Sequence, residues 1–305
     1  MKAFFKNRCV QILLVLVVGY LAYKAVHAYD QRADGFTIDK IHSALPYNPA
    51  YDAPVTEAEI KRANQILNQP FHYLARGFQC YAFESADGKY VLKFFRHQRL
   101  RPHEMFQYIP NFPFLEKFKA KKQAEFKKRE KYLFNGMKNG FIAARHETAI
   151  IYIHLNKTKN LHQQVQITDK VGNCFVVNMD DVEFMLQEKA VLIKPTIESL
   201  MAQGKVDEAK QRLDQIYELL IACAKKGVQD TDGALIRKNN LGFLDDRAIY
   251  IDAGKLAQRK APLSKEVFEE NLKRLWPLHK WLQGKYPELA DHFNKQRQKA
   301  IDSLE

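Results

Sequence analysis

The apolar positions of the chain are distributed in two different ways. Near the N-terminus, residues 9–23 form a run without a single charge, and its apolar side chains would surround a whole helix. Lys2, Lys6 and Arg8 precede the run. Basic residues on the N-terminal side favour an orientation with the N-terminus in the cytoplasm, which would place residues 29–305 across the membrane.

Two uses fit this apolar run. A basic segment, an apolar segment and the small residues before Ala28 are typical of a secretory signal peptide that is cut after Ala28. The same run, extended to Val26 with Lys24 reaching the interface, fits an uncleaved anchor. We expect a single-pass N-terminal membrane anchor, with secretion after cleavage near Ala28 as the alternative.

Beyond residue 29 the pattern switches between helix and strand periods. Thr56, with Glu59 three residues later, predicts a capped helix. Residues 71–85 and 89–95 flank Ala86-Asp87-Gly88 and predict a hairpin. Further strands are predicted at residues 148–155, 165–168, 174–178, 182–186, 241–244 and 248–251, and helices at 116–139, 205–226 and 264–304, the last broken near Gly284 and Pro287.

This order predicts a two-lobed α+β fold, because strands with one embedded helix come first and helices with a small β insert follow. The expected divisions are a membrane anchor or signal segment (1–28), a linker with a short helix (29–69), a β-rich N-lobe with one long helix (70–190) and a mainly helical C-lobe (191–305).

The charge of the chain adds candidate partners. The formal net charge is +13, and the basic residues concentrate in residues 93–101 and 117–131. A basic balance suits nucleic acid, anionic lipid or acidic protein. Because nothing apart from the charge indicates nucleic-acid binding, we expect no nucleic-acid partner. The run 117–131 has helical composition, so it is either a solvated helix face or a contact with anionic lipid or an acidic protein surface.

Several common enzyme classes lack their signatures in this sequence. There is no Ser-His-Asp nucleophile elbow, no HExxH zinc motif and no Rossmann glycine fingerprint. Other residues do point to chemistry. Lys93 is a lone charge within an apolar strand, and an anion or an exposed strand face must accommodate it. Asp252 ends the apolar run AIYID and Asn239 precedes a hairpin, and oxygen ligands on short turns suit Mg²⁺.

In this order the features resemble the protein-kinase-like superfamily. Lys93 stands where the strand lysine that pairs the ATP phosphates would be, and IDAG resembles the DFG-type motif that holds Mg²⁺. It is closer to the IDxG of aminoglycoside-phosphotransferase-like members. Asn239 lies 13 residues before Asp252, the spacing typical of the two metal-binding residues in this family. The run from Gly227 resembles the catalytic loop and places Asp232 in the position of the catalytic base.

The resemblance implies further cofactor-binding residues. Gly77 would belong to the phosphate loop, and Gln187 would end the strand that runs into the adenine-binding hinge. Periodicity selects Glu130 as the helix glutamate that pairs with Lys93, since it shares a face with Phe126, Leu133, Phe134 and Met137; Glu125 is the alternative.

The sequence also departs from the family pattern. The phosphate loop has a single glycine, and the catalytic loop lacks the His and Arg of HRD. The step from Asp232 to Asn239 is seven residues rather than five, so Asp230 competes for the role of base and Asn240 for that of metal ligand.

These observations predict a membrane-targeted, kinase-like phosphotransferase that uses ATP and Mg²⁺. One alternative is a kinase-fold binding module without turnover, so enzymatic activity is left open. The other is a basic protein that docks on anionic membrane surfaces through residues 117–131. No residue identifies the phosphoacceptor.

Overall fold

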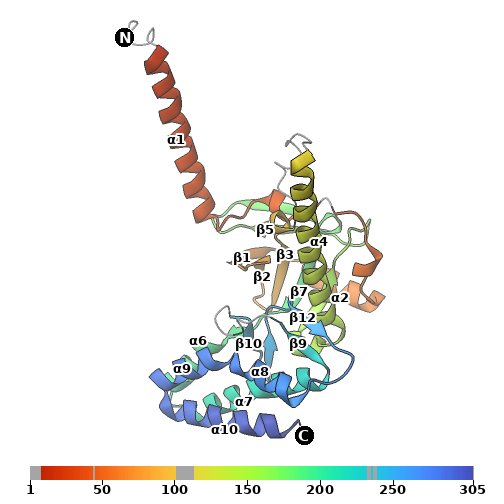
Figure 1. Cartoon of the computed structure of the whole chain (residues 1–305), viewed down its shortest axis with the longest axis vertical. Helices are drawn as coiled ribbons and strands as arrows, with labels where there is room; N and C mark the ends of the chain where they lie inside the picture. Colours follow the sequence, from red (N-terminus) through yellow and green to blue (C-terminus); the bar gives the residue numbers. More distant parts are fainter. Residues whose placement is uncertain (1–7, 44, 101–112, 232–234, 236–238, 305) are drawn as a thin grey trace.

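The protein has two lobes and a projecting N-terminal helix, as the computed structural model shows (Figure 1). The structure describes residues 8–43, 45–100, 113–231, 235 and 239–304. A seven-stranded sheet forms the N-lobe, and helices with short strands form the C-lobe. This arrangement confirms the predicted two-lobed α+β fold.

The helix α1 (Arg8–Arg32) carries the apolar run and stands apart from both lobes (Figure 1). From Val10 to Arg32 it is long and apolar enough to cross a membrane by length and composition, and none of its most apolar stretch is buried. A signal sequence would pass the same test. The helix continues past Ala28 without a break.

The segment that follows α1 packs against the N-lobe. Phe36 and Ile41 are buried in the N-lobe core, and Phe36 makes edge contacts with the rings of Tyr81 and Phe83. After the short helices η2 (Ile38–Lys40) and η3 (Pro49–Tyr51) comes α2 (Glu57–Leu67). Thr56 caps α2 in the expected capping box with Glu59, which confirms that prediction.

The N-lobe sheet has the strand order β4-β7-β3-β2-β1-β5-β6. Its strands are β1 (Phe71–Arg76), β2 (Cys80–Ser85), β3 (Tyr90–Phe95), β4 (Ile150–His154), β5 (Gln164–Thr168), β6 (Cys174–Asn178) and β7 (Phe184–Glu188). The predicted hairpin around Asp87-Gly88 joins β2 and β3. Within the run 71–85 the chain turns back at Gly77, between β1 and β2, where the phosphate loop was expected.

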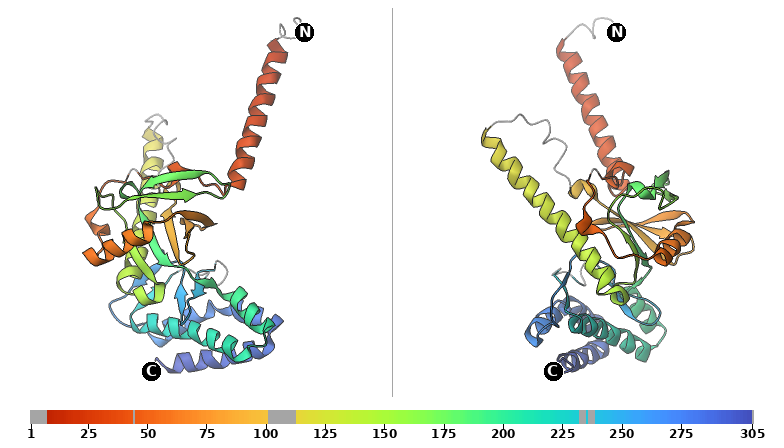
Figure 2. Two further views of the ribbon diagram at one scale, coloured as in Figure 1. Left: turned by 180° about the vertical axis from the view of Figure 1, so that it is seen from behind. Right: turned by 90° about the vertical axis from the view of Figure 1, so that its right-hand side faces the viewer.

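Between β3 and β4 the chain forms η4 (His97–Arg99), the long helix α4 (Pro113–Ile142) and the short α5 (Arg145–Thr148). The C-terminal half of α4 packs on the sheet and the C-lobe, with Leu133, Phe134, Met137 and Phe141 buried. Its N-terminal half extends beyond the N-lobe (Figure 2).

After η5 (Met179–Asp181) and β7, a short connection leads into the C-lobe. Its elements are β8 (Val191–Leu192), α6 (Ile193–Ala202), α7 (Val206–Lys225), β9 (Val228–Asp230), β10 (Leu241–Phe243), β11 (Ala248–Tyr250), β12 (Leu256–Gln258), α8 (Lys265–Lys273), α9 (Trp276–Lys285) and α10 (Pro287–Asp302). The expected break at Pro287 separates α9 from α10, whereas Gly284 lies inside α9.

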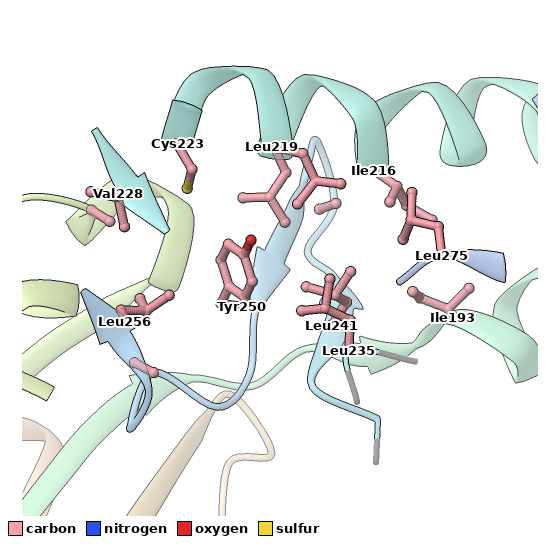
Figure 3. Close-up of a cluster of buried hydrophobic side chains, with 14 of the residues drawn as sticks. Ile193, Ile216, Leu219, Cys223, Val228, Leu235, Leu241, Tyr250, Leu256 and Leu275 are labelled. Carbon is pink, nitrogen blue, oxygen red and sulfur yellow. The ribbon is translucent and has the colours of Figure 1, made fainter. Parts of the chain in front are cut away.

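The apolar face of α7 forms the centre of the C-lobe core. Ile216, Leu219 and Cys223 point from α7 toward Leu241 and Tyr250 on the small β insert (Figure 3). This packing fixes the hairpin β10–β11, and β11 ends directly before Ile251 and Asp252. The core therefore holds in place the turn that carries the predicted metal-binding aspartate.

Candidate functional site

A cavity of about 1050 Å³ lies between the lobes. Its walls come from β1–β3 of the N-lobe, from the connection between β7 and β8, and from the loops around Asn240 and Asp252 in the C-lobe. We call this cavity the cleft. Six residues named from the sequence line it: Gly77, Lys93, Gln187, Asn239, Asp252 and the alternative metal ligand Asn240.

Lys93 reaches the cleft from the middle of β3. Its side chain is 8% exposed, and its neighbours in the strand, Leu92 and Phe94, are fully buried. The ammonium donates hydrogen bonds to Gln187 Oε1 at 2.6 Å and to the backbone carbonyl of Ile251 at 2.5 Å. Burial lowers the pKa of Lys93 below the ordinary lysine value of 10.5, and the nearby negative charge of Asp252 opposes this shift.

Gln187 holds this lysine in place. While its Oε1 accepts from Lys93, its amide donates to the backbone carbonyls of Thr148 and Tyr250. The side chain is 1% exposed, and these bonds tie β7 to both α5 and β11. Gln187 thus links the lobes at the wall of the cleft. Both described hydrogen-bond acceptors of Lys93 are uncharged, and Asp252 supplies a negative charge nearby.

Asp252 lies at the C-lobe side of the cleft, one residue after Ile251. Its Oδ1 accepts a hydrogen bond from the backbone N–H of Gly254 at 3.0 Å, which shapes the IDAG turn. Asn239 is exposed, lines the cleft and has a φ of 53°, a left-handed conformation that asparagine tolerates. Asn240 is 4% exposed, and its backbone carbonyl accepts from the N–H of Ile251 at 2.7 Å.

Two glycines on α4 allow this helix to approach the IDAG turn. A Cβ added to Gly136 would lie 2.5 Å from the carbonyl oxygen of Gly254, and one added to Gly140 would lie 2.9 Å from the Cβ of Ala253. The amide of Asn139 also donates to the carbonyl of Leu256 at 3.0 Å. The position of α4 and the geometry of the turn are therefore coupled through close backbone contact.

Glu130 has a partner other than the predicted one. Its Oε1 accepts a hydrogen bond of 2.9 Å from the hydroxyl of Tyr51, the last residue of η3, which is buried and packs edge-on against Phe134. Burial and the adjacent carboxylate raise the pKa of Tyr51. Glu130 thus anchors the segment before α2 to α4. Glu125, the alternative, pairs with Lys122 one turn away on the same helix.

The two candidates for the catalytic base occupy different positions. Asp230 ends β9, is 5% exposed, and lies beside Tyr250, Asn271 and Arg274 in the C-lobe interior rather than along the cleft. Its backbone carbonyl accepts a hydrogen bond from Arg274. Asp232 lies outside the described residues, directly after Thr231.

Two arginines that sequence reasoning did not single out support the turn between β1 and β2. Arg96 donates to the carbonyls of Gly77 and Phe78 at 2.9 and 3.3 Å, and the guanidinium of Arg99 lies 3.9 Å from the centre of the Phe78 ring. Both line the cleft. The available signal was the basic run 93–101, which contains both residues and Lys93.

The charge of the cleft is strongly positive. Among its described lining residues, six are basic and two acidic: Arg76, Lys93, Arg96, Arg99, Lys189 and Lys255 against Glu188 and Asp252. Burial, followed by the positive charges of Arg96, Arg129 and Arg76, lowers the pKa of Arg99. A cleft of this charge favours an anionic ligand.

The donor set also suits a hard cation. Asp252 offers a carboxylate, Asn239 an amide oxygen, and Gln79 a buried Oε1 for which the described part of the chain provides no hydrogen-bond partner. Within the same residues, no group of three His, Cys, Asp or Glu side chains could hold a metal ion. The residues fit Mg²⁺, which keeps water and ligand phosphate oxygens in its coordination shell and needs only one or two protein carboxylates.

Comparisons with known proteins give structural similarity alone. No protein-family model and no curated protein matches the chain. Three solved structures of WbdD are similar to it: a 2.2 Å crystal structure, one described as a bifunctional kinase-methyltransferase, and a complex with the kinase inhibitor LY294002.

These three matches have 15%, 16% and 15% sequence identity and TM-scores of 0.36, 0.32 and 0.33. They cover 76%, 74% and 74% of this chain, which spans about half the length of the WbdD chains (49%, 47% and 45%).

Proposed function

We propose that this protein is a kinase-like phosphotransferase whose cleft binds ATP together with Mg²⁺. The observation that carries the proposal is the convergence of Lys93 and Asp252 on one cleft from opposite lobes. A buried lysine facing a carboxylate on a glycine turn is suited to hold a polyphosphate and its cation between them.

The cleft has the size and charge for such a ligand. A volume of about 1050 Å³ is ample for a nucleotide. The excess of basic over acidic lining residues favours a ligand with several negative charges. Since Arg96 binds the carbonyls of Gly77 and Phe78, we infer that it fixes the phosphate loop in place of the missing glycines.

We assign roles to the chain's own residues as follows. Lys93 pairs with phosphate oxygens, and Gln187 orients its ammonium in the role first expected of Glu130. Asp252 and Asn239 would hold Mg²⁺, which neutralises phosphate charge when it is bound. Most of the rate enhancement would come from positioning and charge neutralisation.

Asp232 is our choice for the group that accepts the proton of the substrate hydroxyl. Asp230 lies in the C-lobe interior beside Asn271 and Arg274, away from the residues that line the cleft. Asp232 follows two residues later.

We further propose that α1 is a retained membrane anchor. Its length and apolar composition support this role, and the segment directly after it is fixed to the N-lobe through buried Phe36. The anchor would confine the phosphotransferase, and therefore its acceptor, to a membrane surface.

Thermal denaturation of the full chain in detergent or nanodiscs tests the proposed function. ATP with Mg²⁺ at about 100 times its Kd should stabilise the fold by about 2.7 kcal/mol and raise Tm by several degrees. ATP with EDTA should give a smaller shift. Phosphate transfer to water or an added acceptor should be measured in parallel. No nucleotide-induced shift would contradict the proposal, and a shift without any phosphoryl transfer would leave a binding module instead.

A further inference from the structure

We propose that the projecting half of α4, residues 116–131, docks on the anionic phospholipid headgroups of the membrane that α1 enters. The proposal goes beyond the phosphotransfer function, since it concerns a surface remote from the cleft. It relies on α1 as a membrane anchor.

The first observation is the charge and exposure of this half of the helix. Residues 116–131 contain eight basic and three acidic residues, a net charge of +5. Most of their side chains are exposed up to Tyr132, and burial begins at Leu133. About 24 Å of helix therefore extends with little cover from the N-lobe.

The second observation is the arrangement of the lysines. Lys117, Lys121, Lys128 and Lys131 fall within about 80° of one another around the helix axis, and all four are exposed. Ala124 lies within the same stripe, and no acidic residue does. We call these four residues the lysine stripe. A stripe of one sign along an exposed helix is complementary to a surface of opposite charge.

The third observation identifies that surface. The projecting half of α4 and α1 extend from the same end of the N-lobe, opposite the C-lobe, in each of the three views (Figures 1 and 2). A membrane entered by α1 would therefore lie at the end of the molecule toward which α4 projects. An acidic protein or a nucleic acid has no such fixed relation to α1.

The fourth observation is that the base of α1 is fixed to the N-lobe. Besides the burial of Phe36, the backbone carbonyl of Gly35 accepts from the hydroxyl of Tyr81 at 2.6 Å, and Lys170 forms an ion pair of 2.9 Å with Asp34. Asn173 also donates to the hydroxyl of Tyr29, near the end of α1. Membrane insertion of α1 would thus orient the whole N-lobe.

The lengths of the two helices agree with this arrangement. The last turns of α1, from His27 to Arg32, are polar and would hold the N-lobe about 9 Å from the hydrocarbon edge. The projecting half of α4 runs in roughly the same direction as α1 and is longer than this gap, so its N-terminal turns, which carry Lys117 and Lys121, would meet the headgroup layer first (Figures 1 and 2). Docking would then give the domain a second contact with the membrane and a defined orientation.

Hydrogen exchange of the full chain in nanodiscs tests the proposal. In discs containing phosphatidylglycerol, amides of residues 116–131 should exchange at least about tenfold more slowly than in purely phosphatidylcholine discs. Raising the salt concentration from 50 to 500 mM should remove this protection while the chain stays in the disc. Equal exchange in the two lipids would overturn the proposal.

A matched pair of charge-reversal variants separates docking from net charge. Lys117→Glu with Lys121→Glu and Lys128→Glu should abolish the lipid-dependent protection. Lys260→Glu with Lys280→Glu and Lys299→Glu, three exposed C-lobe lysines, should preserve it. If both triple variants lose protection equally, the lysine stripe is not the docking surface.

Two further readouts keep the outcomes distinct. Exchange of the C-lobe core should be unchanged in both triple variants, which checks that they fold. Elution of the chain with nanodiscs reports on α1 independently of α4, so loss of the anchor and loss of docking are distinguishable. Protection that requires an added acidic protein and is indifferent to lipid charge would assign the stripe to that partner and overturn the proposal.

Discussion

Gln187 Oε1 lies 2.6 Å from the ammonium of Lys93, although the two residues are 94 positions apart in the sequence. The pair joins neighbouring strands β7 and β3, and the amide of Gln187 continues the connection to β11 of the C-lobe. One neutral side chain thus orients the lysine of the cleft and couples the two lobes.

Replacing Gln187 with methionine should destabilise the protein by about 1–3 kcal/mol. The change removes one hydrogen bond from each of three buried groups: the Lys93 ammonium, the Thr148 carbonyl and the Tyr250 carbonyl. Chemical denaturation of the variant measures the effect. Gln166→Met, on the exposed face of β5, is the control and should change the free energy of unfolding by less than about 0.5 kcal/mol. An equally small effect at Gln187 would show that its hydrogen bonds do not hold the lobes.

Gly136→Ala should also be destabilising, by about 1–3 kcal/mol, because the new Cβ would meet the Gly254 carbonyl oxygen at 2.5 Å. It should in addition weaken nucleotide binding, since the IDAG turn must move. Gly284→Ala is the matched helical control, as its Cβ would meet nothing within 4 Å. Helix propensity predicts that this control stabilises the protein by up to about 1 kcal/mol. Comparable Tm values for the two variants would contradict close packing of α4 on the turn.

Acid should weaken the N-lobe through His162. Burial and the neighbouring His154 lower the pKa of His162 to about 4, whereas an unfolded histidine titrates near 6.5. The unfolded state therefore binds a proton that the folded state rejects, and the free energy of unfolding falls as the pH drops from about 6.5 to 4. The loss is on the order of 3 kcal/mol. Denaturant titrations across this range give the free energy of unfolding at each pH. This free energy should change less with pH for His162→Gln than for His72→Gln, which replaces an exposed histidine on β1. Identical slopes would contradict the lowered pKa.

Much of the fold follows from local pattern. The Thr56–Glu59 capping box, the Asp87-Gly88 turn and the apolar face of α7 are all visible in sequence, and the structure confirms each of them. The helix α6 was not predicted, because no capping residue precedes it: its N-cap, Leu192, makes no side-chain capping bond. The turn at Gly77 was expected as the first hairpin turn, and the structure places it between β1 and β2.

The candidate site was predictable in part. Lys93, Asn239 and Asp252 stand out as polar residues next to apolar strands, and the structure brings them to one cleft. The partners of Lys93 depend on contacts between distant segments, which periodicity on one helix does not reveal. Glu130 therefore shares the predicted face of α4 yet binds Tyr51, and an ordinary-looking glutamine on β7 holds the lysine.

Binding of ATP to three forms of the full chain tests the central claim most directly. Isothermal titration with Mg²⁺ present should give saturable 1:1 binding to the wild type. Lys93→Met and Asp252→Asn should each weaken it at least about tenfold, equivalent to about 1.4 kcal/mol. Lys89→Met and Asp245→Asn, which replace exposed residues of the same charge, should bind as the wild type does. No binding by the wild type, or binding that is unaffected by the changes at Lys93 and Asp252, would contradict the assignment of the cleft as a nucleotide site.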